Sequence, residues 1–156
     1  MNKELMEFHF YNSESFEVGY IISRNDKLIC ICNVSPDKQY DGITIRYIDD
    51  IIYVEKNTQY LSELIDNTIE QKTIEFSLVL DNVLEYFKEH NVLVEFLIDS
   101  TVSIGFVKKF DNEVCLLSIV DENGVYDGDI YFRKTDIKSF DFDNIELRKL
   151  LKKIKK

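Results

Sequence analysis

The chain matches itself at a fixed offset of 86 residues, and this repeat restricts the possible folds more than any other feature. Between Gly19 and Leu64, nine of 46 positions carry the same residue as the position 86 further on, without a gap. Random pairing would give roughly three such matches. The matched positions are Gly19/Gly105, Val34/Val120, Tyr40-Asp41-Gly42/Tyr126-Asp127-Gly128, Asp50-Ile51/Asp136-Ile137, Leu61/Leu147 and Leu64/Leu150, and Phe10/Phe96 lies upstream. The sequence therefore predicts an internal duplication in which matched residues share matched surroundings.

Each repeat has the pattern of about five short strands followed by a helix. "FEVGYIIS" and "VSIGFVKK" begin with alternating apolar residues around Gly19 and Gly105, as in strands that another backbone approaches closely. "KLICICNV" and "EVCLLSIV" are apolar on both faces and predict strands that are covered twice. "TQYLSELIDNTI" and "NIELRKLLKKIKK" have helical spacing, with Thr58 and either Asp143 or Asn144 as N-caps. "SLVLDNVLEYFKEHN" predicts a further amphipathic helix between the repeats.

The order of strand, turn, "DG", strand and a last strand opened by "DDI" or "TDI" resembles the small SH3-like or Sm-like barrels, in a layout like that of uncharacterised bacterial proteins. The resemblance covers both repeats and implies a fold but no activity. We therefore expect a mainly β protein with some α-helix, built of two tandem SH3-like or Sm-like barrels. The first barrel and its closing helix would occupy residues 1–70, a linker helix 71–91, and the second barrel with a basic C-terminal helix 92–156.

Charge argues against nucleic acid as the general partner. The net charge is −10, but the last nine residues carry six positive charges, which leaves −16 for the remainder. An acidic body repels phosphate backbones. We expect the basic C-terminal helix to dock on the second barrel by its apolar side, with an anionic membrane, nucleic acid or another copy's acidic body as alternatives.

Composition favours a reducing, aqueous environment. The start of the chain lacks the basic and apolar segments of a signal peptide, and the most apolar stretches are too short to cross a bilayer. Three cysteines are an odd number, which is unusual for a disulfide framework. The sequence therefore predicts a cytoplasmic protein without membrane insertion.

The duplicated "YDG" segments supply the only candidate binding residues. Asp-Gly is a hairpin-turn signal because Gly accepts positive φ and Asp bonds to the nearby backbone, so a turn is the simplest interpretation. Alternatively, Tyr40, Asp41, Tyr126 and Asp127 form two related rims, where an aromatic face beside a carboxylate suits a base, a peptide or an arginine.

Other chemistry-bearing residues have simpler structural interpretations. The candidates are Cys30, Cys32, Cys115, His9, His90, Asp50 and Asp136. The matches of the cysteines are Leu116, Ser118 and Ile29, so all three are expected in the core. The two histidines are far apart in sequence, and the duplicated aspartates precede a strand, where they suit a turn. We assign no catalytic residue, metal ligand or cofactor.

The expected function is a non-enzymatic binding or assembly protein that acts through protein–protein contacts, including self-association. Two alternatives remain open: an acidic inhibitor or immunity-type protein that masks a basic site on its partner, and a protein that sequesters a small nucleotide-like ligand between aromatic rims. RNA binding by a Sm-like protein is disfavoured by charge and confined to the basic tail.

Overall fold

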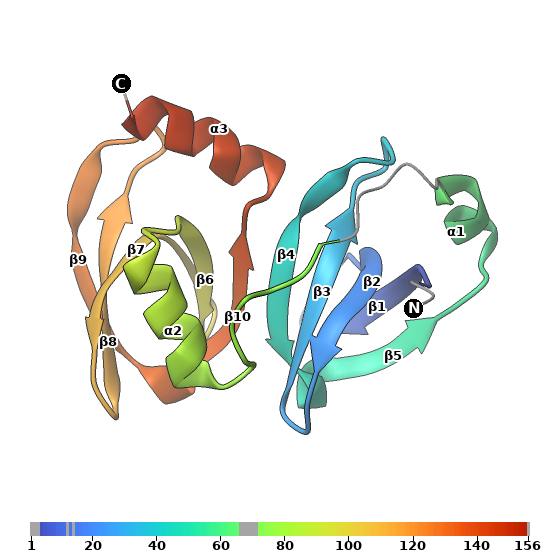
Figure 1. Ribbon diagram of the computed structural model, residues 1–156, viewed down its shortest axis with the longest axis horizontal. Coiled ribbons are helices and arrows are strands. Elements are labelled where there is room, and N and C mark those ends of the chain that lie inside the picture. Colours follow the sequence, from blue (N-terminus) through green and yellow to red (C-terminus); the bar gives the residue numbers. More distant parts are fainter. Residues whose placement is uncertain (1–3, 12, 14, 66–71, 156) are drawn as a thin grey trace. The chain divides into compact units, whose positions relative to one another are not determined.

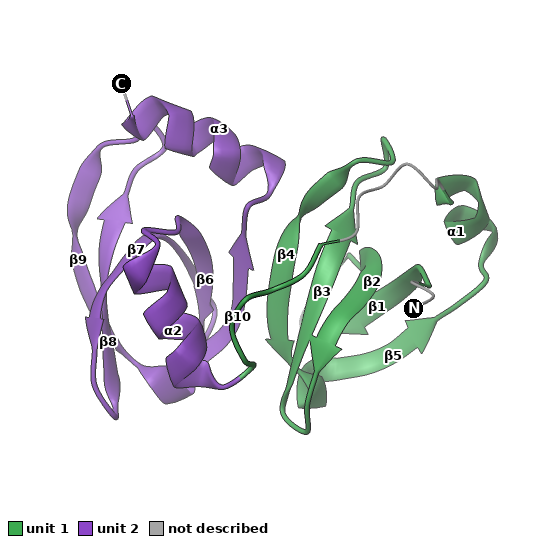
Figure 2. Cartoon of the chain, viewed as in Figure 1, with its two compact units in different colours: residues 1–78 green, residues 79–156 purple. Residues whose placement is uncertain are grey.

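The chain divides into two compact units. The computed structural model describes residues 4–11, 13, 15–65 and 72–155 (Figure 1). Residues Met1–Leu78 form unit 1 and Val79–Lys156 form unit 2 (Figure 2). The helix expected as a separate linker begins at Leu80, inside unit 2, and it packs there.

Both units contain five strands and a short 3-10 turn before the last strand. Unit 1 comprises β1 (Met6–Phe10), β2 (Glu17–Arg24), β3 (Leu28–Val34), β4 (Tyr40–Tyr47), η1 (Ile48–Asp50), β5 (Ile51–Glu55) and α1 (Gln59–Leu64). Unit 2 comprises α2 (Leu80–Glu89), β6 (Val94–Ile98), β7 (Thr101–Phe110), β8 (Val114–Val120), β9 (Tyr126–Arg133), η2 (Lys134–Asp136), β10 (Ile137–Phe142) and α3 (Ile145–Ile154). The mainly β composition with helices follows the sequence pattern.

The expectation of two small barrels joined by a linker helix is wrong. The strands of each unit form an open row, in the order β5-β1-β2-β3-β4 in unit 1 and β10-β6-β7-β8-β9 in unit 2. Within neither unit does the last strand pair with the fourth, so neither set of five closes on itself. Local alternation of apolar residues identifies a strand but does not specify which distant strand it will pair with, and this is why the sequence pattern misled. β5 lies at one end of the row in unit 1, and β9 lies at one end of the row in unit 2.

The two units share their pairing register from the second strand onward. Gly19 lies opposite Asn33, and Gly105 lies opposite Ile119, 86 residues further in both strands. The same offset relates β3 to β8, β4 to β9 and η1 to η2, with bulges at matching positions. Matched residues from β2 onward therefore hold matched places in their own units.

The first strand departs from this offset. Met6 pairs with Gly19 in unit 1, whereas Val94 pairs with Gly105 in unit 2, so β1 and β6 correspond at an offset of 88. The connection between the first two strands is two residues shorter in unit 2. The counterpart of Phe96 is consequently Phe8, and the match of Phe10 with Phe96 made from sequence is wrong.

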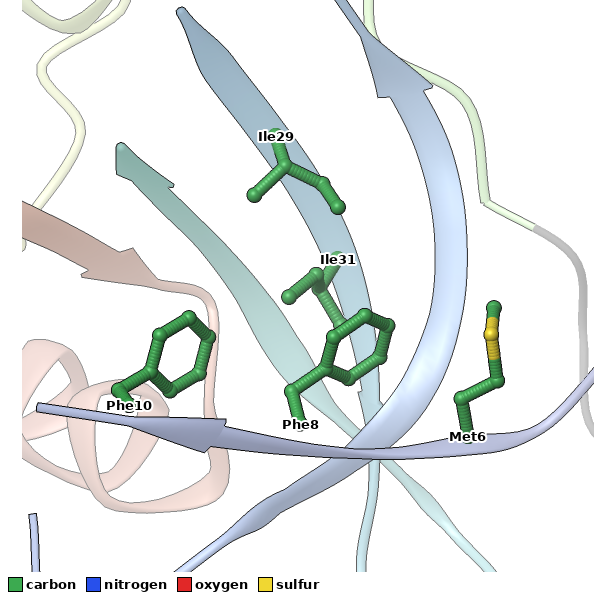
Figure 3. Packing of buried hydrophobic residues seen from close by; sticks show 5 residues of the cluster. All are labelled: Met6, Phe8, Phe10, Ile29 and Ile31. Carbon is green, nitrogen blue, oxygen red and sulfur yellow. The ribbon is translucent and has the colours of Figure 1, made fainter. Parts of the chain in front are cut away.

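The core of unit 1 lies between β1 and β3. Side chains of β1 point toward those of β3 in the cluster of Met6, Phe8, Phe10, Ile29 and Ile31 (Figure 3). The other face of β3 is also buried, since Cys32 and Val34 pack with Tyr20. The prediction that this strand is covered on both faces is confirmed. All three cysteines are buried and unbonded to one another, as expected.

The helices begin where the sequence indicates. The side chain of Thr58 accepts a hydrogen bond from the Leu61 N–H, and Asn144 does the same for Leu147. In α3, Leu147 and Leu150 pack against Leu93 of the same unit, so the basic helix docks by its apolar side as predicted. The expected stripe of α1 extended to Ile69, which lies outside the described residues.

Candidate partner-binding surface

The "YDG" segments are β-bulges, not hairpin turns. In unit 1 the turn itself lies at Ser35–Gln39, where the Ser35 N–H donates to the Gln39 carbonyl oxygen at 2.8 Å. Cys32 pairs with Ile43 and Val34 with Tyr40, so two residues of β4, Asp41 and Gly42, lie opposite one residue of β3. Gly42 and Gly128 supply the positive φ, 87° and 95°, that the bulge needs. The turn interpretation was wrong, although the need for glycine was read correctly.

Tyr40 is engaged by its own unit. It is half-buried against the cluster of Tyr20, Cys32 and Val34, and the Lys72 ammonium lies 4.6 Å from the centre of its ring. Asp41 is half-buried beside it. These two residues therefore form part of the packed wall of unit 1.

The corresponding residues in unit 2 are exposed. The Tyr126 hydroxyl donates a hydrogen bond to Asp129 (2.9 Å), which also accepts from Ser118 (3.2 Å) and from the Lys108 ammonium (3.3 Å). The Tyr126 hydrogen bond, followed by the Lys108 and Ser118 contacts, holds the pKa of Asp129 below its ordinary range. The same bond raises the pKa of Tyr126. Asp127 is exposed and outside this network, so the two "YDG" copies do not build equivalent sites.

The other singled-out residues lie apart. Asp50 and Asp136 end the 3-10 turns, where their carbonyls accept from the Tyr11 and Asp99 N–H groups. His90 caps the C-terminus of α2, with its Nδ1 3.1 Å from the Tyr86 carbonyl oxygen. Among the described residues, no three His, Cys, Asp or Glu side chains gather as metal ligands.

A surface that the sequence did not reveal lies on unit 1. It consists of His9 (β1), Phe16, Tyr53 (β5) and Tyr60 (α1), which we call the aromatic face. The His9 ring stacks on the Tyr53 ring, with the ring centres 4.1 Å apart, and its centre is 5.2 Å from that of Phe16. Phe16 in turn contacts Tyr60 edge-on, with the ring centres 5.8 Å apart. Phe16, Tyr53 and Tyr60 are nevertheless 39%, 50% and 37% exposed. Aromatic rings that contact one another and remain exposed are typical of protein interfaces.

Two carboxylates border the aromatic face. Glu7 and Glu55 are direct cross-strand partners, and strand alternation places Glu7 on the same side of β1 as His9. The Nε2 of His9 is 3.3 Å from Glu55 Oε1, close enough for an ion pair but without the geometry of a hydrogen bond. Glu7 is only 6% exposed, and its Oε2 has no hydrogen-bond partner among the described residues. A buried carboxylate oxygen without a partner is costly to stability, whereas the Glu55 side chain, at 47% exposure, is accessible from outside.

The edge strand β5 continues this surface. Ile52, Tyr53 and Val54 are all exposed, although they follow one another in an apolar strand. The matching strand β10 is largely buried, and the contrast is sharpest between Val54, at 38% exposure, and its counterpart Phe140, at 1%. One side of β5 pairs with β1, and its other side has no partner among the described strands.

The helix α2 accounts for part of this difference. Its Phe87 ring lies 5.6 Å from Phe140 and 5.1 Å from Phe142, so the helix covers β10. Lys134, which is buried, ties the start of α2 to the unit by an ion pair with Asp81. In unit 1 the described residues before β1 are Glu4 and Leu5, and they form no helix.

No helix in the described part of the chain is both long and apolar enough to span a bilayer. No protein family, curated protein or solved structure matches the chain. The candidate surface therefore has to be interpreted from its own residues.

Proposed function

We propose that the protein is a non-enzymatic binding protein whose principal contact surface is the β5 edge of unit 1 together with the aromatic face. The observation that carries this proposal is the exposure of Ile52, Tyr53 and Val54 on an edge strand. Soluble proteins normally protect such edges with charges, proline or a covering element, because unpaired N–H and C=O groups invite another strand. An edge left apolar in this way is suited to a protein partner.

The comparison between the units supports the same function. Shared register from β2 to the 3-10 turns, together with the repeated residues, favours an origin by duplication. In such a pair, a position that is apolar and exposed in one unit but covered in the other has acquired a separate use. Val54 and Phe140 are such a pair, and so are Tyr53 and the buried Ser139.

Site-specific photo-cross-linking tests the proposal. A benzophenone amino acid at Ile52 should capture a discrete protein in the native host, while the same group at exposed Asp37, in the β3–β4 turn, should not. Cross-links of equal yield and pattern at both positions would contradict a dedicated surface.

A second candidate function is the masking of a basic site on a partner, as an inhibitor or immunity-type protein does. The two carboxylates that border the aromatic face favour it, as does the charge of −16 outside the last nine residues. Binding of this kind should weaken as salt rises, because exposed charges are screened. An affinity that is the same at low and high salt would exclude this alternative and leave the general binding function in place.

The third candidate function is the binding of a small nucleotide-like ligand. A thermal-shift screen against nucleotides tests it, and an unchanged melting temperature across the panel would contradict it.

A further inference from the structure

The two units keep the same carboxylate pair but surround it differently. Glu7 and Glu55 of unit 1 correspond to Glu95 and Asp141 of unit 2, and both pairs lie directly across two strands. The rings of the aromatic face do not recur. His9, Phe16, Tyr53 and Tyr60 correspond to Leu97, Val102, Ser139 and Glu146. The aromatic face is therefore a feature of unit 1 alone.

We propose that the aromatic face binds an arginine side chain carried by an extended segment of a basic partner protein, which adds as a strand along the free edge of β5. This inference rests on the proposed binding function and specifies the chemistry of the partner.

The face offers what a guanidinium group requires. Its planar cation stacks on aromatic rings and donates several hydrogen bonds in one plane. Tyr53 and Phe16 present exposed rings, and Glu55, whose side chain is 47% exposed, presents an accessible acceptor. A guanidinium placed over these rings could donate to Glu55, while the buried carboxyl group of Glu7 on the neighbouring strand adds negative charge behind the face.

Unit 1 already uses this kind of contact inside its own fold. The guanidinium carbon of Arg46 lies 3.8 Å from the centre of the Phe10 ring. The place of Arg46 in unit 2 is taken by Phe132, which packs ring to ring on Phe96 at 5.7 Å. Arginine and an aromatic ring therefore occupy equivalent places in the two units.

Charge disfavours anionic ligands at this face. Phosphate groups and acidic peptides would meet Glu7 and Glu55, and Lys56, which follows Glu55, is already paired with Glu4 at 3.5 Å. A lysine ammonium meets the charge requirement, but it lacks the flat surface that stacks on Tyr53.

The free edge of β5 sets the form of the partner. An added strand uses the unpaired backbone groups of β5 for affinity, and every second side chain of that strand points to the side of Tyr53 and Glu55. An arginine at one such position can reach the rings, while its neighbours lie beside Ile52 and Val54. A free arginine would lack the backbone contacts.

The test uses three nine-residue peptides, capped at both ends, of alternating threonine and valine with arginine, lysine or citrulline at the centre. Citrulline has the shape of arginine without its charge. Calorimetric titration of the full chain should show binding of the arginine peptide, with the citrulline peptide weaker by about tenfold or more and the lysine peptide intermediate.

The variants come from the chain itself. Tyr53→Ser and Phe16→Val introduce the residues that unit 2 carries at the same places, and together they should weaken the arginine peptide by about tenfold. Glu7→Gln should reduce the preference for arginine over citrulline. Tyr131→Ser, on the exposed strand β9, is the control and should leave all three affinities unchanged. Thermal melts of each variant verify folding.

The outcomes separate this inference from the proposed function. Equal binding of arginine and citrulline peptides, or no binding of any peptide at about 1 mM, overturns the arginine inference. If Ile52 still cross-links to a partner in that case, the binding function stands. Light scattering that shows a dimer in the parent chain and a monomer in the double variant would instead identify a second copy as the occupant and overturn the inference.

Discussion

Gly19 lies directly against the carbonyl group of Cys32 in the neighbouring strand, so that a Cβ atom at Gly19 would overlap the carbonyl oxygen. Gly105 and Ser118 repeat this relationship in unit 2. The close approach occurs where β2 and β7 pair with β3 and β8 in identical register. The repeated glycine is thus required by backbone proximity, as the sequence predicted.

Gly19→Ala should destabilise unit 1 by about 1–3 kcal/mol, because the added methyl group meets a carbonyl fixed in the sheet rather than a flexible side chain. Urea unfolding measures the loss. Gly128→Ala is the matched control: no atom lies within 4 Å of its Cβ position, and only the φ of 95° opposes alanine, at a cost of about 1–2 kcal/mol. A neutral Gly19→Ala would show that the strands can separate there.

Lys134→Ala should destabilise unit 2 by about 2 kcal/mol, since the buried ammonium also donates to the Asp111 carbonyl oxygen at 2.8 Å. Asp81 is exposed at the surface, so water can replace its partner. Lys134→Met loses the ammonium, which lies 5.5 Å from the centre of the Phe110 ring, but keeps an apolar side chain of similar length and should cost less than alanine. Hydrogen exchange of α2 amides should rise in the alanine variant, and unchanged protection of α2 would contradict a role in anchoring this helix.

Glu95→Gln should raise the melting temperature at neutral pH. Burial, and then the charge of Asp141, raise the pKa of Glu95 above its ordinary value of 4.5. The folded state therefore holds the proton more tightly than the unfolded state, and stability falls as pH rises through the folded pKa. The advantage of glutamine should disappear below pH 4.5. Glu122→Gln, in an exposed turn, is the control for the loss of a carboxylate at the surface.

The native chain should not react with thiol reagents at pH 8. Burial, with a smaller effect of Cys32, raises the pKa of Cys30 to about 12, and burial raises that of Cys115 to about 12 against an opposing effect of Lys134. Cys30 and Cys115 therefore carry almost no thiolate at this pH, and all three thiols are buried away from the reagent. Absorbance after addition of a disulfide reagent should show no release in buffer and three equivalents in denaturant. Rapid release in buffer would indicate that β3 or β8 opens readily.

Features set by neighbouring residues could be predicted from the sequence. The caps Thr58 and Asn144 lie before helices because short polar side chains bond to the next turn. The doubly covered strand at Leu28–Val34 follows from its continuous apolar run. The close backbone approach at Gly19 could be predicted because a glycine inside a strand weakens it, unless a neighbouring backbone leaves no room for a side chain.

Features that depend on residues far apart in the sequence could not be predicted. The Asp-Gly pair requires positive φ at Gly42 in a turn or in a bulge, and only the pairing of β3 with β4 distinguishes these. The Phe10/Phe96 match failed because the first connection differs in length between the units. The aromatic face combines His9, Phe16, Tyr53 and Tyr60, which no local pattern connects. The sequence did contain one indication that the units differ here, because the 86-residue repeat matches Tyr53 with Ser139 and Phe16 with Val102.

Because the units share their register, the β3–β4 and β8–β9 hairpins correspond residue by residue. The hairpins Leu28–Tyr47 and Val114–Arg133 have equal length, the same bulge and the same sequence of cross-strand partners. Exchanging one hairpin for the other would therefore keep the number of residues and the pairings inside the hairpin. Such chimaeras would let each surface be studied in duplicate or removed altogether, with the scaffold held constant.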